Sequence, residues 1–319
     1  MLKYLVIVLD DTSVSYCHYK NAHSESKLIS QEDLKAGILF AMKENLMIQF
    51  VYPEYKLPEE YINIIETIDH SKIVPAGCSE EGNIIVIDKP EEIGSIALNI
   101  EGTYVLRISK QYLFENTSKI REIIHKALRI NIILTDIETF TDDDFNKYDS
   151  CLKEFEEEIE RLILKGDSPQ LNLLTDRIGL TSMNNCNAGW ESIALAPDGN
   201  FYPCPGFYNI QTNSISDKKI TLGNVKEGLQ IKNPNLYKIS YAPICRVCDS
   251  YQCKRCILLN YRTTLEINTP SHEQCVVSHL ERNRSRDLLY KMRGHGDFAV
   301  GIDIEQIYYT DPIDKLIYH

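Results

Sequence analysis

The chain has 319 residues, of which 43% are hydrophobic and 25% are charged, and its net charge is −12. These values are ordinary for a globular protein with a sizeable core in one large domain or two smaller ones. The acidic balance argues against nucleic-acid binding, which usually needs a basic surface. No apolar run approaches the ~20 residues that span a bilayer, and the start is too short for a signal peptide. We therefore expect a cytoplasmic protein with neither a nucleic-acid nor a membrane partner.

Strand and helix signals alternate over residues 1–170. Apolar and β-branched runs predict strands at 3–9, 47–52, 83–88, 103–109 and 130–135. Capping signals and helical spacing predict helices at 30–45, 58–68, 91–97, 111–128 and 141–165. This alternation predicts an α/β fold: a parallel β/α domain over residues 1–170, built as an open or partial barrel.

The pattern changes after Gly166. Residues 171–293 begin with a segment rich in Asn, Pro, Gly, Tyr and Cys, for which we expect hairpins and loops, and end in a helix from Ser271 to Arg293. One side of that helix is basic. We favour the interpretation that this side is simply exposed to solvent; the alternative is that it binds an acidic peptide leader. The C-terminal tail, 294–319, is apolar enough at Phe298, Ile302, Ile304 and Ile307 to dock as a strand or extended arm.

Seven of the ten cysteines lie in one stretch of the second half of the chain. They are Cys186, Cys204, Cys245, Cys248, Cys253, Cys256 and Cys275. In a reducing compartment, clustered cysteines favour metal over disulfides. The Cys245/Cys248 and Cys253/Cys256 pairs have the Cys-x2-Cys spacing that aims two sulfurs at one ion. Seven thiols exceed one four-thiolate zinc site and approach the eight that two cubane iron–sulfur clusters need. The alternative, that some are buried apolar cysteines, applies more to Cys186 and Cys275 than to the pairs.

The order of motifs in this stretch resembles the SPASM domain, the auxiliary iron–sulfur module of radical SAM peptide-maturing enzymes. The resemblance runs through Cys186-Asn-Ala-Gly189, Pro197-Asp-Gly-Asn-Phe-Tyr-Pro-Cys204, Leu222-Gly-Asn-Val225, the two cysteine pairs and Cys275. Asp198-Gly199 is also a strong hairpin turn signal. The central block departs from the family, because its last two gaps are each one residue short.

The resemblance implies a division of the seven cysteines between two [4Fe-4S] clusters. One cluster would take Cys186, Cys204 and Cys256, with its fourth position open or held by an unidentified ligand. The other would take Cys245, Cys248, Cys253 and Cys275. His279 is a conceivable further ligand, although the sequence favours a surface histidine, and zinc remains the alternative metal.

The first half of the chain lacks a motif that radical SAM enzymes carry. They hold Cys-x3-Cys-x2-Cys in the loop after the first strand, whereas the corresponding stretch here contains only Cys17. We therefore expect a radical-SAM-like scaffold without its cluster and without bound S-adenosylmethionine. Cys17, His18 and His23 offer an alternative metal or redox site, although a plain loop without such a role is favoured. Cys78 and Cys151 receive no role.

Residues 4–19 and 33–42 are similar to the CXXX repeat peptide maturases, which are associated with small cysteine-repeat peptides. The resemblance implies maturation of a cysteine-rich precursor peptide, in which a cluster would bind a substrate thiolate at an open iron or relay electrons to a partner maturation protein. The second hypothesis is a non-enzymatic, peptide-binding adaptor with structural zinc or iron–sulfur. The third, a complete radical SAM enzyme, is disfavoured by the absent motif, so catalytic activity and catalytic residues stay open.

Overall fold

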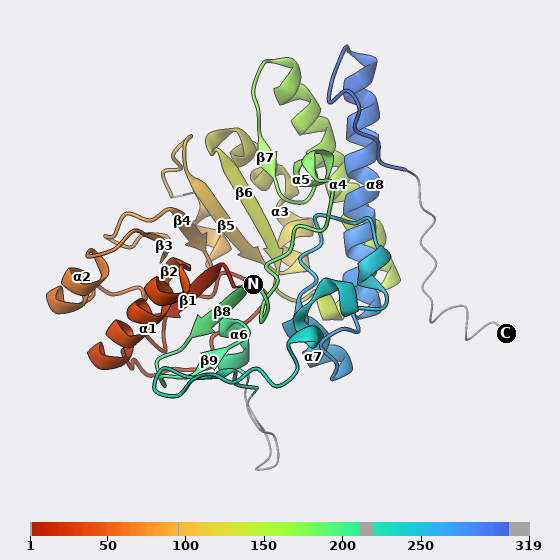
Figure 1. Ribbon diagram of the computed structural model, residues 1–319. Helices are drawn as coiled ribbons and strands as arrows, with labels where there is room; N and C mark the ends of the chain where they lie inside the picture. Colours follow the sequence, from red (N-terminus) through yellow and green to blue (C-terminus); the bar gives the residue numbers. More distant parts are fainter. Residues whose placement is uncertain (1, 95, 211–219, 306–319) are drawn as a thin grey trace.

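The computed structural model describes residues 2–94, 96–210 and 220–305, and its centre is one nine-stranded sheet (Figure 1). The strand order is β7-β6-β5-β4-β3-β2-β1-β8-β9, with every pairing parallel except β8–β9. The strands are β1 (Tyr4–Val8), β2 (Met47–Val51), β3 (His70–Pro75), β4 (Ile84–Ile87), β5 (Thr103–Ile108), β6 (Arg129–Leu134), β7 (Gln170–Leu171), β8 (Ser192–Leu195) and β9 (Phe201–Tyr202). A small separate sheet pairs β10 (Gly223–Asn224) with β11 (Gly228–Leu229).

Eight α-helices are present in the described ranges. They are α1 (Gln31–Glu44), α2 (Glu59–Ile65), α3 (Lys110–Ile123), α4 (Asp142–Leu164), α5 (Thr175–Gly179), α6 (Pro205–Tyr208), α7 (Ile257–Thr264) and α8 (His272–Gly294). The side chain of Ser30 caps α1 by accepting from the Asp33 amide, and Thr141 and Asp144 form a capping box at α4. None of the described helices is both long enough and apolar enough to cross a membrane.

Alternation along the strands separates two apolar faces of the sheet. Leu5 and Ile7 of β1 belong to a core that includes Leu34 and Ile38 of α1, whereas Val6 between them belongs to a smaller cluster on the opposite face. Strands β1 to β7 lie side by side in chain order, so the successive crossovers all advance in one direction. The predicted α/β fold with successive parallel β/α units is thereby confirmed.

Several predicted elements change in detail. Strand β3 was not predicted, the expected helix at 91–97 is a 3-10 turn over Pro90–Gly94, and α7 forms where loops were expected. The strands β7, β8 and β9 all continue the main sheet beyond residue 170. The proposed division of the chain at that residue stays a prediction, and the sheet itself crosses it.

Helix α8 packs against α4, and its cations are paired within the chain. Arg284 makes a bidentate contact with Asp149, and Lys291 Nζ lies 2.6 Å from an oxygen of Glu156. The favoured interpretation of this basic side as a solvated face is therefore wrong, since α4 supplies its counter-charges. In the tail, the segment 298–304 packs on the larger apolar core without forming a strand. Ile307, also expected to dock, lies outside the described residues.

Candidate metal centre

The β8–β9 hairpin brings two of the predicted ligands to the sheet. Gly199 adopts φ +78° in the turn, a conformation that glycine reaches without strain, and Ala194 and Leu195 pair with Tyr202 and Phe201. Strand β8 pairs in parallel with β1. The predicted hairpin is confirmed, and its strands place Cys186 before β8 and Cys204 after β9, next to the loop that follows β1.

Two of these cysteines immediately precede short helices. Cys204 is the N-cap residue of α6 and Cys256 is that of α7. At such positions the first backbone N–H groups of a helix lack partners inside it. The N–H groups of Leu258 and Leu259 accordingly favour the thiolate form of Cys256, although burial dominates and raises the pKa of this thiol to about 12.

A cavity of about 740 Å³ lies against the inner face of the sheet. Side chains of β1, β2, β4, β5 and β6 form one wall, and the loop after β1 and the cysteine-rich segment form the other. Four cysteines line this cavity and are called the lumen group: Cys17, Cys186, Cys204 and Cys256. Three of them are the set that the SPASM resemblance implies for one cluster, and the fourth comes from the first half of the chain.

The four thiols of the lumen group influence one another electrostatically. Burial raises the pKa of the Cys17 thiol, and the neighbouring Cys186 and Cys256 raise it further. Burial likewise raises the pKa of Cys204, with smaller contributions from the other three. Cys186 has solvent-exposed surface, yet it lines the cavity among protein atoms, and burial raises its pKa as well. Unbound thiolates are therefore costly here, and a cation that binds them would remove that cost.

The loop that carries Cys17 is tied firmly to the barrel. Arg107 of β5 donates from Nε to the Cys17 carbonyl (2.9 Å) and from Nη2 to the Tyr19 carbonyl (2.6 Å). The Nδ1 atom of His18 lies 3.0 Å from the Leu134 carbonyl at the end of β6. His23 instead stacks on Tyr208, with ring centroids 4.7 Å apart. His23 is therefore engaged elsewhere, whereas Cys17 and His18 line the same cavity as Cys186, Cys204 and Cys256.

A second set of cysteines lies beside α8 and is called the helix-side group: Cys245, Cys248, Cys253 and Cys275. Burial raises the pKa of the Cys253 thiol to about 12, with added effects from Cys245 and Cys248, so these three lie near one another. Cys275 is on α8 itself, one turn before His279, whose Nδ1 is 2.7 Å from the Cys275 carbonyl.

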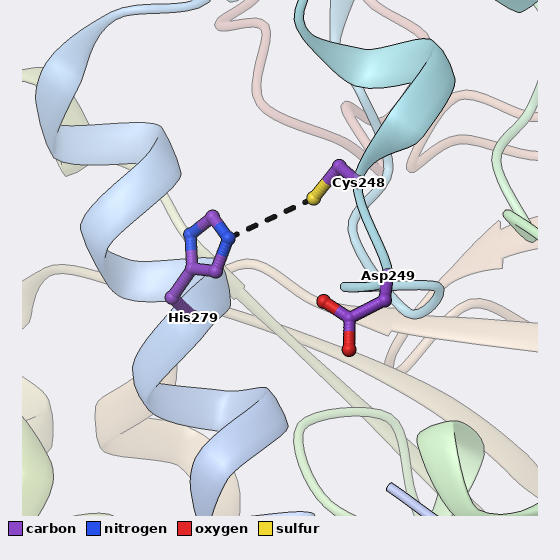
Figure 2. Close-up of side chains that lie close together, drawn as sticks. All are labelled: Cys248, Asp249 and His279. Carbon is purple, nitrogen blue, oxygen red and sulfur yellow. Dashed lines mark hydrogen bonds between the residues drawn. The ribbon is translucent and has the colours of Figure 1, made fainter. Parts of the chain in front are cut away.

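Figure 2 shows His279 pointing from α8 toward Cys248, with 3.7 Å between Nε2 and the sulfur. A carbonyl can only accept, so Nδ1 carries the proton and the neutral ring presents the Nε2 lone pair to Cys248. Burial lowers the pKa of His279 and favours this neutral form. The histidine expected at the surface is thus partly buried, and its ring has the orientation of a metal ligand whose other nitrogen is fixed by a backbone carbonyl.

Asp249 completes the group of potential ligand atoms around Cys248 and His279, all within 4.8 Å of one another (Figure 2). Its carboxylate also faces two arginines: Oδ2 lies 3.2 Å from Arg282 Nη1 and 3.8 Å from Arg177 Nη2. A carboxylate already balanced by two guanidinium groups is a poor additional ligand, so Asp249 is better explained as their counter-ion.

The remaining cysteines lie apart from both groups. Cys151 is buried in the core between α3 and α4, where its sulfur is 3.2 Å from Thr117 Oγ1. Cys78 is in the turn after β3. No disulfide joins any cysteines in the described ranges.

Comparison with known proteins agrees with this geometry. A family model for SPASM, described as an iron-sulfur cluster-binding domain, matches residues 186–257. Residues 186–257 therefore belong to the SPASM family of domains. The matched residues contain six of the seven predicted ligands, and Cys275 lies beyond them on α8. No curated protein matches the chain in sequence.

Solved structures of anSMEcpe share the fold. Polyhistidine-tagged anSMEcpe with bound AdoMet has a TM-score of 0.62 and 12% identity, covering 92% of this chain and 96% of that one. Native anSMEcpe with bound AdoMet and Cp18Cys peptide has a TM-score of 0.61 and 14% identity, covering 92% and 99%. The fold shared with anSMEcpe therefore extends over nearly the whole chain.

The residues around the lumen group suit an iron–sulfur cluster. A cubane holds its thiolates apart, so sulfurs spaced around a cavity are what it requires. The cavity lining contains no carboxylate in the described residues, and it includes Lys254, a cation near the anionic sulfurs. The buried Nδ2 of Asn185, beside Cys186, lacks a hydrogen-bond partner among the described atoms and is a donor available to a cluster sulfur.

Proposed function

We propose that this SPASM-domain protein takes part in the maturation of a cysteine-repeat peptide, supported by iron–sulfur clusters in two sites. The observation that carries the proposal is the cavity that joins the inner face of the barrel to three cysteines of the SPASM domain. Such a cavity puts a peptide held in the barrel within reach of a cluster. The structure of anSMEcpe with a Cp18Cys peptide, which has the same fold, supports a peptide as the partner.

The proposed ligands divide as the resemblance implies. Cys186, Cys204 and Cys256 serve the lumen site, and the helix-side group serves the second. When bound, the clusters would supply electron transfer or coordination of a substrate sulfur. The chain's own residues contribute the apolar barrel wall and the buried cation Arg107, while the N–H groups at the start of α7 favour thiolate at Cys256.

A second function is favoured by one observation, the neutral His279 ring directed at Cys248. Three cysteines and a histidine form a common structural zinc site. In that case the helix-side group holds zinc, and the chain acts as a non-enzymatic peptide-binding adaptor that assists a partner maturase. Reduced thiols in both alternatives require a cytoplasmic location.

Anaerobic purification followed by metal and sulfide analysis tests the proposal. We expect a brown protein with about four to eight irons per chain and matching acid-labile sulfide. A colourless protein with stoichiometric zinc and no iron would overturn it in favour of the adaptor. The metal-loaded chain is then titrated with synthetic cysteine-repeat peptide and with a serine-substituted copy. Preference for the cysteine peptide supports the proposed substrate class, and equal binding of both contradicts it.

A further inference from the structure

The three cysteines that the SPASM resemblance assigns to the first cluster leave one coordination position unexplained. A cubane with three protein thiolates keeps an iron open, as at a site that binds an exogenous ligand. The residues that line the cavity decide whether such an opening exists. Only one further cysteine, Cys17, lies among them in the described part of the chain.

Several contacts hold Cys17 at this wall. Besides the two bonds from Arg107, the Val14 amide donates to the Tyr52 carbonyl (3.0 Å), and the Tyr19 hydroxyl donates to the Val14 carbonyl (3.2 Å). The side chain of Arg107 is only 4% exposed. The backbone on both sides of Cys17 is thus fixed to the barrel, as ligand placement requires.

His18 is the other side chain from this loop with ligand chemistry. It lines the same cavity, but its Nδ1 is engaged by the Leu134 carbonyl. Cys17, by contrast, is near enough to Cys186 and Cys256 for their charges to affect it. Cys17 lines the cavity with the three SPASM cysteines and offers the same thiolate ligand as they do, so it is grouped with them.

We infer that Cys17 is the fourth ligand of the lumen cluster, which makes this site a four-thiolate site shared between the loop after β1 and the SPASM domain. The inference rests on the proposed function, because it takes the lumen group to hold an iron–sulfur cluster. On binding, each thiol releases its proton. Lys254 and Arg107, both close enough to Cys17 to favour its thiolate, balance part of the resulting negative charge.

A complete ligand set changes what the lumen cluster can do. With four protein thiolates no iron is left for a substrate sulfur, so the cluster would serve electron transfer or structure rather than anchoring of the peptide. The loop that carries a SAM-binding cluster in the resembled radical SAM enzymes would here be joined to the auxiliary one.

The test compares wild type with Cys17→Ser after anaerobic reconstitution with iron and sulfide. Electron paramagnetic resonance is recorded before and after mild oxidation. A cubane with three thiolates readily loses its unprotected iron, so we expect C17S to give a three-iron signal and about one iron fewer per chain. Cys78→Ser, a cysteine away from the cavity, and His18→Gln are the matched controls and should behave as wild type. An H18Q variant that gives the three-iron signal while C17S does not would assign the position to His18 and overturn the inference.

Two results separate this inference from the proposed function. If wild type holds its clusters and C17S has the same iron content with no three-iron signal, the inference fails while the proposed function stands. If wild type holds no iron, both fail. Thiol alkylation of the wild-type chain covers the case in which C17S does not fold. Cys17 should be protected to the same degree as Cys186 in the loaded chain and should react after chelation, whereas labelling of Cys17 in the loaded chain would overturn the inference.

Discussion

The two cysteine groups are assembled in opposite ways. In the helix-side group three cysteines lie within residues 245–253, and the fourth, Cys275, lies on α8. In the lumen group the four cysteines come from separate segments that the sheet brings together. The first group depends on a local turn, and the second depends on the whole barrel. Disrupting the local turn should therefore affect one site, whereas disrupting the barrel should affect the other.

Replacing Cys245 and Cys248 together with serine should have the largest effect. Two of the ligands are lost at once, so we expect the helix-side site to lose its metal and residues 234–253 to exchange amide hydrogens faster. The lumen site should keep its metal, because its cysteines are held outside this segment, by the β8–β9 hairpin, the loop after β1 and the start of α7. Metal analysis and hydrogen exchange measure both, with Cys78→Ser as the control. Full metal content in the double variant would contradict the ligand assignment.

Single substitutions on α8 test whether Cys275 or His279 is the fourth ligand of the helix-side site. We expect Cys275→Ser to lower the iron content of the second site, because three thiolates leave one iron unprotected and readily lost. His279→Gln should keep the iron and shift the reduction potential, since the ring contacts Cys248. The reverse pattern, with zinc lost from H279Q and retained in C275S, would favour the structural zinc site.

Replacing Arg107 tests how strongly the lumen group depends on the contacts between the barrel and the loop that carries Cys17. Arg107→Met leaves the Cys17 and Tyr19 carbonyls without their donor, for a cost of about 2–4 kcal/mol in unfolding free energy. Iron should be lost from the lumen site first. Arg121→Met, which removes an exposed and loose ion pair with Glu154, should change stability little. Denaturant unfolding of the two variants gives the comparison, and equal stabilities would show that Arg107 does not hold the loop.

The last effect concerns pH and accumulates over several pH units. Burial raises the pKa of Glu281 to about 8 from its ordinary 4.5, and Tyr148 donates to this carboxyl at 2.7 Å. Between these values the folded chain binds more protons than the unfolded chain, so the unfolding free energy falls as pH rises, by up to about 1.4 kcal/mol per unit. Glu281→Gln should flatten this slope. Denaturant unfolding of the two metal-loaded proteins between pH 4.5 and 8 measures the unfolding free energy at each pH. Equal slopes for wild type and E281Q would contradict the raised pKa of Glu281.

Local patterns predicted much of the fold and the helix-side ligands. Capping by Ser30 and Thr141, the Asp198-Gly199 turn and the apolar strands all depend on neighbours in sequence. Strand β3 escaped prediction because its first half, His70-Ser-Lys72, is polar and only half-buried, and its pairing with β2 and β4 decides its conformation.

The role inferred for Cys17 could not be read from spacing. The sequence showed one cysteine where radical SAM enzymes carry three, which favoured a plain loop. The contacts of that loop with β5 and β6, made by Arg107 and His18, hold Cys17 at the cavity that Cys186 and Cys204 also line. The pairing of β1 with β8 joins residues that are far apart in the sequence. For that reason β8 was expected in a separate hairpin, although it is a strand of the main sheet.

The pairing of β1 with β8 also has a consequence for biosynthesis. Tyr4 pairs with Ser192, about 190 residues later in the chain. A ribosome adding ~5–20 residues per second needs roughly 10–40 s to cover that interval. During this time one edge of β1 has no partner strand, although its apolar residues are among the most buried in the finished protein. The growing chain is thus most prone to aggregation before the SPASM domain emerges, and truncation ahead of β8 should give insoluble protein.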